Sequence, residues 1–342
     1  MSAPAPLIRC QNLWKLYGPG EALIRANPGL SADDAIAQAG TTLAALRDVS
    51  LEVQKGEIFV IMGLSGSGKS TLVRCMTGLI GATKGDLFLG NDNLRTIDAE
   101  RLIELRRHKI SMVFQDFALL PHLSVLDNVA FPLRIHGIDR ITRQAKAREM
   151  IELVGLKGRE AHFPHELSGG QQQRVGIARS LTTDPDIWFL DEPFSALDPL
   201  IRHEMQDEFL RLQNSLQKTI VFITHDFEEA VRLADRIAIM NHGRVVQVDT
   251  PERLVLAPAD PYVAAFTAKI PRHRVLRIGS IMGAVAAGAS GTPVAAKAVV
   301  AEVAGRVLSS DAALPVVDDA GKVVGSIDRS KIIATVFGEG KA

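Results

Sequence analysis

A glycine-rich loop that follows a buried strand constrains the fold of this chain more than any other feature of its sequence. Residues 58–62, "IFVIM", form a continuous apolar run that predicts a buried β-strand, and the loop "GLSGSGKS" at 63–70 follows directly. The apolar residues of "KSTLVRCMTGLI" at 69–80 then recur with helical spacing. In such a loop, backbone N–H groups surround phosphate groups at the N-terminus of the helix. The sequence therefore predicts a phosphate-binding loop between a strand and a helix.

The loop matches the pattern G-x-x-x-x-G-K-[ST] in full, and this pattern assigns roles to its last two residues. Lys69 would reach the β- and γ-phosphates of a nucleotide, and the hydroxyl of Ser70 would ligate Mg²⁺. We expect the nucleotide to be held by the whole loop and the residue after it, namely Gly63, Leu64, Ser65, Gly66, Ser67, Gly68, Lys69, Ser70 and Thr71.

Two more apolar runs predict the sheet to which this loop belongs. Residues 186–192, "DIWFLDE", and 219–224, "TIVFIT", are short and almost continuously apolar, as in strands that are buried on both faces of a mostly parallel sheet. A helical pattern at 202–216 lies between them. Alternating strands and helices of this kind predict the α/β class.

Polar side chains follow both of these strands. Asp191 and Glu192 end the first; Asp191 suits Mg²⁺ binding through water, and Glu192 suits a general base that orients an attacking water. His225 directly follows the second strand, at the sheet edge where ligands bind in open α/β folds. Paired carboxylates at a strand end are, in isolation, more often a solvated edge. The phosphate-binding loop upstream favours the functional interpretation.

The stretch "LSGGQQQR" at 167–174 is a second glycine-rich helix start. Ser168, Gly169 and Gly170 precede the helical pattern "QQQRVGIARSL", so that backbone N–H groups and one hydroxyl could hold a second anion. Together with "GLSGSGKST", Gln115, "IWFLDEPFSALD" and His225, in this order and spacing, the stretch closely resembles the ATP-binding-cassette ATPases over roughly residues 1–270.

This resemblance implies the reaction and the roles of the site residues. The substrate is ATP with Mg²⁺, the metal site comprises Ser70, Gln115 and Asp191, and the catalytic residues are Glu192 and His225. An aromatic residue near the N-terminus stacks on adenine in the family, and Tyr17 in "KLYG" is the best match. Further ATP-binding residues are Gln115 and, in the second stretch, Ser168, Gly169, Gly170 and Gln171.

The resemblance also explains why one chain has two anion sites. It implies that two chains pack head to tail as a homodimer with twofold symmetry, each ATP lying between the 63–70 loop of one chain and the 167–171 stretch of the other. ATP would hold the dimer closed, and hydrolysis would release it.

Length and composition narrow the class of cassette protein. The 342 residues hold one cassette, whereas cassette proteins of the soluble translation type usually carry two. Lys and Arg number 39, as do Asp and Glu, so no basic field favours nucleic acid as a partner. The best candidate for a membrane span, 281–303, is interrupted by Pro293 and Lys297 and does not qualify. A separate import ATPase is favoured over a soluble non-transport cassette protein that acts on nucleic acid or ribosomes.

More narrowly, the sequence resembles the ATPase of importers for glycine betaine, proline and related quaternary amines. The resemblance rests on residues 56–80, 112–131 and 198–213 and on an inserted helical element. It implies two integral-membrane permease subunits, an extracytoplasmic solute-binding protein, and a peripheral location at the cytoplasmic face of the inner membrane. Importers of choline, histidine or another amino acid look similar and stay as alternatives.

Two segments lie outside the cassette pattern. Residues 18–45 predict the inserted helical element, with Ser31 as N-cap and Gly40 at the end of a helix. We expect a cassette over 1–270, with a helical subdomain at about 115–180, and a small α+β domain over 271–342.

The predicted small domain resembles a single cystathionine-β-synthase-type (CBS) repeat. Its "LPVVDDAGKVVGSIDRSKII" at 314–333 predicts a strand, a turn, a strand and a helix, and Asp328 and Lys331 stand where adenosine-binding repeats have Thr and Asp. We therefore expect no tight adenylate binding there, but association with the same domain of a second chain. The apolar face expected for this association comprises Leu314, Val316, Val324 and Ile327.

Overall fold

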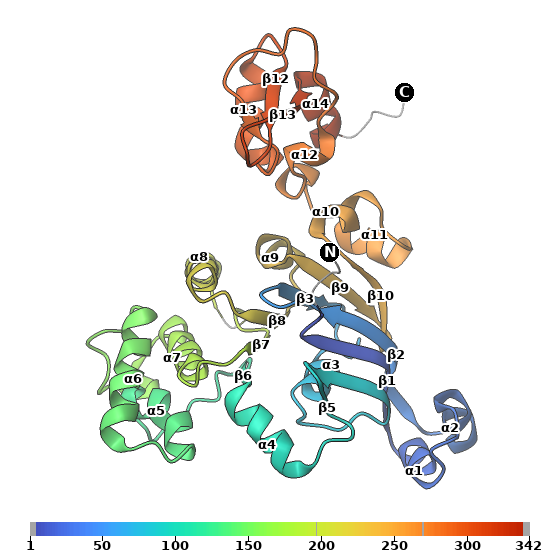
Figure 1. Ribbon diagram of the computed structural model, residues 1–342, viewed down its shortest axis with the longest axis vertical. Coiled ribbons are helices and arrows are strands. Elements are labelled where there is room, and N and C mark those ends of the chain that lie inside the picture. Colours follow the sequence, from blue (N-terminus) through green and yellow to red (C-terminus); the bar gives the residue numbers. More distant parts are fainter. Residues whose placement is uncertain (1–4, 196, 269, 338–342) are drawn as a thin grey trace. The chain divides into compact units, whose positions relative to one another are not determined.

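The computed structural model describes residues 5–195, 197–268 and 270–337 of the chain (Figure 1). The chain divides into two compact units, Met1–Val248 and Asp249–Ala342. The first contains the phosphate-binding loop and every predicted site residue. The predicted boundary at residue 270 lies inside the second unit, after two short helices, α10 (Pro251–Leu256) and α11 (Pro261–Thr267).

A six-stranded sheet, in the order β10-β9-β3-β8-β7-β6, forms the centre of the first unit. Strand β8 lies between β3 and β7 and pairs in parallel with both, and β7 also pairs in parallel with β6. The strands β3, β7 and β8 are almost entirely buried, which confirms the α/β class. Their carboxyl ends therefore meet at one edge of the sheet. The strands are β3 (Ile58–Met62), β6 (Ile110–Val113), β7 (Ile187–Asp191), β8 (Thr219–Ile223), β9 (Arg236–Asn241) and β10 (Arg244–Asp249).

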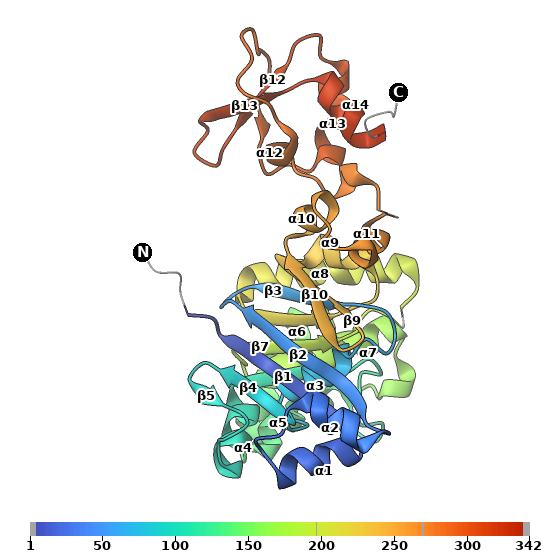
Figure 2. The ribbon, with the colours of Figure 1, turned by 90° about the vertical axis from the view of Figure 1, so that its right-hand side faces the viewer.

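A second sheet covers the helix that follows the loop. It is antiparallel, in the order β2-β1-β4-β5, with β1 (Ile8–Tyr17), β2 (Leu43–Val53), β4 (Lys84–Leu89) and β5 (Asp92–Asn93). Helix α3 (Lys69–Met76) shares one apolar cluster with strands of both sheets (Figure 2). The burial of Leu72, Val73 and Met76 in this cluster fixes the helix, and with it the loop.

Two short helices lie between β1 and β2, at the predicted insertion. Helix α1 spans Pro19–Ala26 and α2 spans Ala32–Ala39, with the Ser31 hydroxyl accepting a hydrogen bond from the Asp34 N–H at 3.0 Å and Gly40 ending the helix at φ 64°. They share a small apolar core with the ends of β1 and β2, made of Trp14, Leu16, Ile24, Ala32, Ala35 and Ala44.

The remaining helices of the first unit include the block of α5, α6 and α7 at the left of Figure 1. Helix α7 packs on α5 and α6 and contacts β6. Its Ser180 hydroxyl accepts a hydrogen bond at 2.9 Å from the indole Nε1 of Trp188, a fully buried residue of β7. The helices are α4 (Ala99–His108), α5 (Val125–Ile135), α6 (Arg140–Leu153), a short 3₁₀ helix (Pro164–Glu166), α7 (Gly169–Leu181), α8 (Pro199–Leu216) and α9 (Phe227–Leu233).

The second unit has a small sheet and core of its own. The three-stranded sheet runs β11-β12-β13, with β11 parallel and β13 antiparallel to β12. Its elements after α11 are a 3₁₀ helix (Arg272–Arg274), α12 (Ile278–Ile281), β11 (Val294–Ala295), α13 (Val300–Ser309), β12 (Leu314–Val317), β13 (Val323–Ile327) and α14 (Arg329–Phe337).

Three of the four residues expected to form an association face do not lie at the surface of this unit. Leu314, Val316 and Ile327 are buried in the unit's own core, but Val324 is exposed. The strand β13 has two exposed residues, Val323 and Val324, before its buried end, so Val324 alone of the expected face is at the surface.

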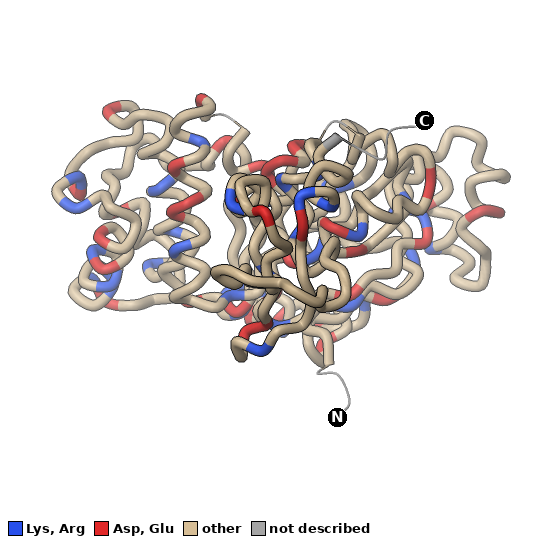
Figure 3. Tube along the Cα trace, turned by 90° about the horizontal axis from the view of Figure 1, so that it is seen from above, with Lys and Arg blue, Asp and Glu red and all other residues tan. Residues whose placement is uncertain are grey.

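The charged residues of both signs are distributed over the described trace, with basic and acidic residues interspersed along the chain (Figure 3). Among the helices of the described residues, none has the length and apolar character that crossing a membrane requires.

Candidate nucleotide-binding and catalytic site

The phosphate-binding loop joins the end of β3 to the start of α3 and approaches other backbone closely. A Cβ at Gly63 would lie 2.4 Å from the carbonyl oxygen of Met240, and one at Gly68, where φ is +101°, would lie 2.5 Å from that of Ala45. Only glycine fits at these two positions. The loop is thereby held against β9 and β2 while its free side faces a cavity.

The ammonium of Lys69 lies inside this loop. Its Nζ donates hydrogen bonds to the carbonyl oxygens of Gly63 at 2.9 Å and Leu64 at 3.1 Å. Burial lowers the pKa of Lys69, and the nearby carboxylates of Glu192 and Asp191 oppose that shift. The Ser67 hydroxyl is buried in the same loop with no hydrogen-bond partner. Ser67 does not line the cavity that the loop faces, so the Lys69 cation in a glycine loop is the feature that fits a polyanionic ligand such as a nucleoside triphosphate.

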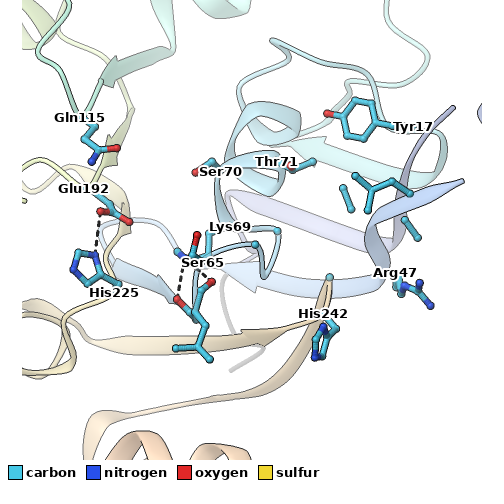
Figure 4. Close-up of a pocket in the computed structure, with 18 residues that line it drawn as sticks. Tyr17, Arg47, Ser65, Lys69, Ser70, Thr71, Gln115, Glu192, His225 and His242 are labelled. Atoms are coloured by element: carbon cyan, nitrogen blue, oxygen red, sulfur yellow. Dashed lines mark hydrogen bonds and ion pairs between the residues drawn. The ribbon is translucent and has the colours of Figure 1, made fainter.

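A cavity of about 960 Å³ joins the loop to residues from distant parts of the sequence (Figure 4). Of the predicted site residues, it is lined by Tyr17, Gly63, Leu64, Ser65, Gly66, Gly68, Lys69, Ser70, Thr71, Gln115, Glu192 and His225. Sequence reasoning did not find the rest of the lining, which is Leu43, Ala44, Ala45, Arg47, His242 and Gly243. These residues belong to no motif; strand pairing and a hairpin bring them to the loop.

Glu192 and His225 meet at the edge of the sheet. The Glu192 Oε2 and His225 Nδ1 atoms are 3.0 Å apart, a contact drawn as a dashed line in Figure 4. Glu192 has a left-handed backbone with φ 45°, and its N–H donates to the Ile223 carbonyl at 3.0 Å. This conformation costs energy in a residue that is not glycine and is characteristic of functional sites. It turns the carboxylate, which is about one-fifth exposed (19%), toward the cavity.

Asp191 is the last residue of β7 and does not itself line the cavity. Burial raises the pKa of Asp191, the neighbouring carboxylate of Glu192 raises it further, and Arg74 and Lys69 oppose the shift. A divalent cation nearby would stabilise its ionised form. Within the described residues no cluster of three or more His, Cys, Asp or Glu side chains could hold a metal. A cation here would need hydroxyl and phosphate oxygens as further ligands.

Gln115 reaches the cavity from the segment after β6. This segment continues with two residues in the left-handed region, Phe117 at φ 59° and Ala118 at φ 46°. The guanidinium of Arg179, near the end of α7, donates to both of their carbonyl oxygens at 2.8 Å. Helix α7 therefore fixes the backbone that follows Gln115.

The second glycine-rich stretch starts α7 and is not brought to this cavity. The Ser168 hydroxyl accepts from the Gln171 N–H at 3.4 Å, and the Gln171 side-chain oxygen accepts from the Ser168 N–H at 3.1 Å. This is a reciprocal helix cap. None of Ser168, Gly169, Gly170 and Gln171 lines the cavity that contains the chain's own phosphate-binding loop.

Comparison of this sequence with known proteins identifies the family of the chain. The profile of the ABC transporter family matches residues 46–195. A trimethylamine N-oxide transport system ATP-binding protein of Pelagibacter ubique is 52% identical over 337 residues, which is 98% of this chain and 99% of that protein. The chain belongs to the ABC transporter ATPases.

Other ABC transporter ATPases match over shorter stretches. A glycine betaine transport ATP-binding protein of Bacillus subtilis is 47% identical over 277 residues, 80% of this chain and 66% of that protein. Among solved structures, the dimeric post-hydrolysis state of the ATP-binding cassette MJ0796, bound to ADP and Pi, superposes with a TM-score of 0.60 at 33% identity, covering 71% of this chain and 98% of the other. The similarity confirms the cassette fold predicted from the motifs and identifies this chain as an ATPase that binds ATP.

Proposed function

We propose that this ABC transporter ATPase powers the import of a fully methylated amine, with trimethylamine N-oxide or glycine betaine as the solute. The observation that carries the ATPase part of the proposal is the cavity in which the phosphate-binding loop faces the paired Glu192 and His225. The solute class is supported by the relative from Pelagibacter ubique, a trimethylamine N-oxide transport subunit that matches at nearly full length. A transport subunit matching at that length favours an importer over a non-transport cassette protein.

In this proposal each part of the cavity has one task in ATP hydrolysis. The loop 63–68 and Lys69 hold the phosphates, and Tyr17 stacks on adenine. Ser70, Gln115 and Asp191 would hold Mg²⁺, which neutralises charge on the phosphate oxygens. Glu192 accepts a proton from the attacking water, and His225 holds the carboxylate through the 3.0 Å contact.

The start of α7 would complete the site of a second chain. Ser168, Gly169, Gly170 and Gln171 do not reach their own chain's cavity, yet they present a helix N-terminus and a hydroxyl that suit an anion. A homodimer in which each ATP lies between the loop of one chain and α7 of the other uses both features. The similar cassette that was solved as a dimer with ADP and Pi supports this arrangement.

We also propose two permease subunits and an extracytoplasmic solute-binding protein as partners, with the ATPase at the cytoplasmic face of the membrane. A groove of about 260 Å³ offers a docking place for a permease segment. Its exposed apolar residues include Leu79 and Phe114, and Arg106, Arg107 and His136 line it too. Phe114 directly precedes Gln115, so a segment in this groove would lie beside the ATP cavity. An amphipathic segment with an acidic residue fits this chemistry.

Reconstitution with the membrane partners tests the function and the solute. With the permease in lipid vesicles, we expect the solute-binding protein loaded with trimethylamine N-oxide or glycine betaine to raise the rate of ATP hydrolysis several-fold. Choline and histidine serve as the alternative solutes. Choline is also a fully methylated amine, so stimulation by choline alone would contradict trimethylamine N-oxide and glycine betaine as the solute, and stimulation by histidine alone would contradict the proposed solute class. A chain that never associates with a permease would favour the non-transport alternative.

The C-terminal unit would keep two ATPase chains close together. We propose that residues 271–342 form a single CBS-like domain that associates across the dimer, raising the effective concentration of the two cassettes. A chain ending at Ile270 should still hydrolyse ATP but be more monomeric without nucleotide than the full chain, as measured by light scattering. Equal monomer fractions for the two chains would exclude this role. Micromolar binding of adenylate to the full chain that is lost on truncation would contradict the expectation that the domain binds no nucleotide.

A further inference from the structure

The inserted helices leave and rejoin the sheet at one end of the ATP cavity. Tyr17 is the last residue of β1, Leu43 is the first of β2, and the two are paired in the sheet. Both are exposed, and both line the cavity. Figure 4 shows Tyr17 and Glu192 on opposite sides of the phosphate-binding loop. The insertion therefore connects the two residues that form the end of the cavity away from the catalytic pair.

The first turn of α1 is held tightly against the returning chain. The Gly20 N–H donates a hydrogen bond to the Thr42 hydroxyl at 2.8 Å. A Cβ at Gly20 would lie only 2.6 Å from that same oxygen, so glycine permits the close approach. Ile24 of α1 and Ala35 of α2 lie in the same small apolar core as Trp14 of β1. The position of α1 relative to the end of β1 is thus fixed by packing and by a hydrogen bond.

A partly buried ion pair connects α1 to the strand that ends at Tyr17, with the Glu21 side chain 26% exposed. The Lys15 Nζ lies 2.7 Å from the Glu21 Oε1, and the Lys15 side chain is only 7% exposed. The same ammonium lies 4.9 Å from the centroid of the Tyr17 ring, as in a cation–π contact. The pairing of β1 with β2 shifts in register between Lys15 and Leu16, so it is this distance, and not regular strand alternation, that places the two side chains together.

The pair restrains the aromatic ring from one side. A buried ammonium needs a partner, and Glu21 supplies one from the inserted helix. With Lys15 held in place over the ring, the other face of the ring is available for stacking in a fixed orientation. A binding surface that is ordered before the ligand arrives loses less entropy on binding.

We propose that Glu21 and Lys15 are positioning residues for Tyr17, and that the inserted helices thereby set the affinity of the cavity for the base of the nucleotide. This inference rests on the proposed role of Tyr17 in stacking on adenine. It predicts that the pair acts on recognition of the base and not on binding of the phosphates, which the loop 63–70 holds at the other end.

Two ligands separate these effects in the full-length chain. In Glu21→Gln we expect the dissociation constant of ATP to rise about fivefold, while that of inorganic tripolyphosphate, which has no base, stays within about twofold. Both can be measured by calorimetry. For the same reason, KM for ATP should rise and kcat at saturating ATP should stay unchanged.

Asp33→Asn is the matched control, because it removes the same charge from the other inserted helix, α2, where Asp33 is exposed. It should alter neither affinity. Since Glu21 is proposed to act through Lys15, the double variant Glu21→Gln/Lys15→Met should bind ATP no more weakly than Lys15→Met alone.

Several results would overturn the inference. If Glu21→Gln weakened the binding of ATP and of tripolyphosphate equally, the variant would have disturbed the whole cavity. If Asp33→Asn weakened ATP binding as much as Glu21→Gln, the cause would be a long-range effect of the lost charge. Tyr17→Ala separates failure of the inference from failure of its premise. If Tyr17→Ala weakens ATP binding and Glu21→Gln does not, the inference alone is wrong. If Tyr17→Ala leaves ATP binding unchanged, the stacking role of Tyr17 is wrong as well.

Discussion

Replacing Glu192 with glutamine should leave ATP binding intact and slow ATP hydrolysis by about 100-fold or more. An amide has nearly the shape of a carboxylate but cannot accept a proton from the attacking water. Its oxygen can still contact His225, which lies 3.0 Å from the carboxylate, so the geometry of the site should persist. With hydrolysis blocked, Mg·ATP should trap a stable dimer that light scattering detects.

Glu204→Gln provides the matched control, since Glu204 is exposed on α8 and does not line the cavity. It should hydrolyse ATP at the rate of the unmodified protein. If Glu192→Gln also did so, the assignment of Glu192 as the general base would be wrong. If it lost ATP binding together with hydrolysis, a structural role for Glu192 would explain the result better.

Two variants that are inactive alone should recover activity when mixed. Lys69→Ala should weaken ATP binding on the order of 100-fold, because it removes the cation from the loop. Ser168→Arg should leave ATP binding to each chain intact but block closure of the dimer at the start of α7. In a mixed dimer, one composite site combines the intact loop of one chain with the intact α7 start of the other. ATPase activity of the mixture should therefore exceed that of either variant.

A chain with both substitutions, mixed with the unmodified protein, is the complementary control. If the sites are shared between chains, both sites of this mixed dimer contain one substitution and are inactive. If each chain used its own loop and its own α7, one site would be unaffected. Mixed dimers can be isolated through two affinity tags. ATPase activity in the mixed dimers of the second mixture, but not in those of the first, would contradict the shared site.

The parts of the site that the sequence predicts are those determined by local chemistry. The loop 63–70 follows from a buried strand, two glycine positions and a helix start, all within one short segment. The cap at Ser31 and the helix end at Gly40 are equally local, and the structure confirms both. The helix start at Ser168 is local as well, although the sequence predicts an anion site there and not the reciprocal cap that Ser168 and Gln171 form.

Long-range contacts determine what the sequence could not reveal. Arg47 and Gly243 line the cavity because the Arg47 N–H donates to the Gly243 carbonyl at 2.8 Å, while the Gly243 N–H donates to the Ser67 carbonyl at 3.0 Å. Neither residue belongs to a recognisable pattern. Glu192 follows the end of β7 with a left-handed backbone and donates its N–H to the Ile223 carbonyl at the end of β8, which its residue type does not predict. The ion pair of Lys15 and Glu21 depends on how the inserted helix packs.

The two tryptophans of the chain give it a built-in optical readout. Trp14 packs against the inserted helices, and Trp188 connects β7 to α7 through its 2.9 Å hydrogen bond to Ser180. Indole emission depends on the polarity and hydrogen bonding around the ring, so each tryptophan responds to a different part of the cassette. In Trp188→Phe the remaining emission would come from the insertion, and in Trp14→Phe from the contact between α7 and the sheet. Nucleotide titrations can then be followed at either place without an attached dye.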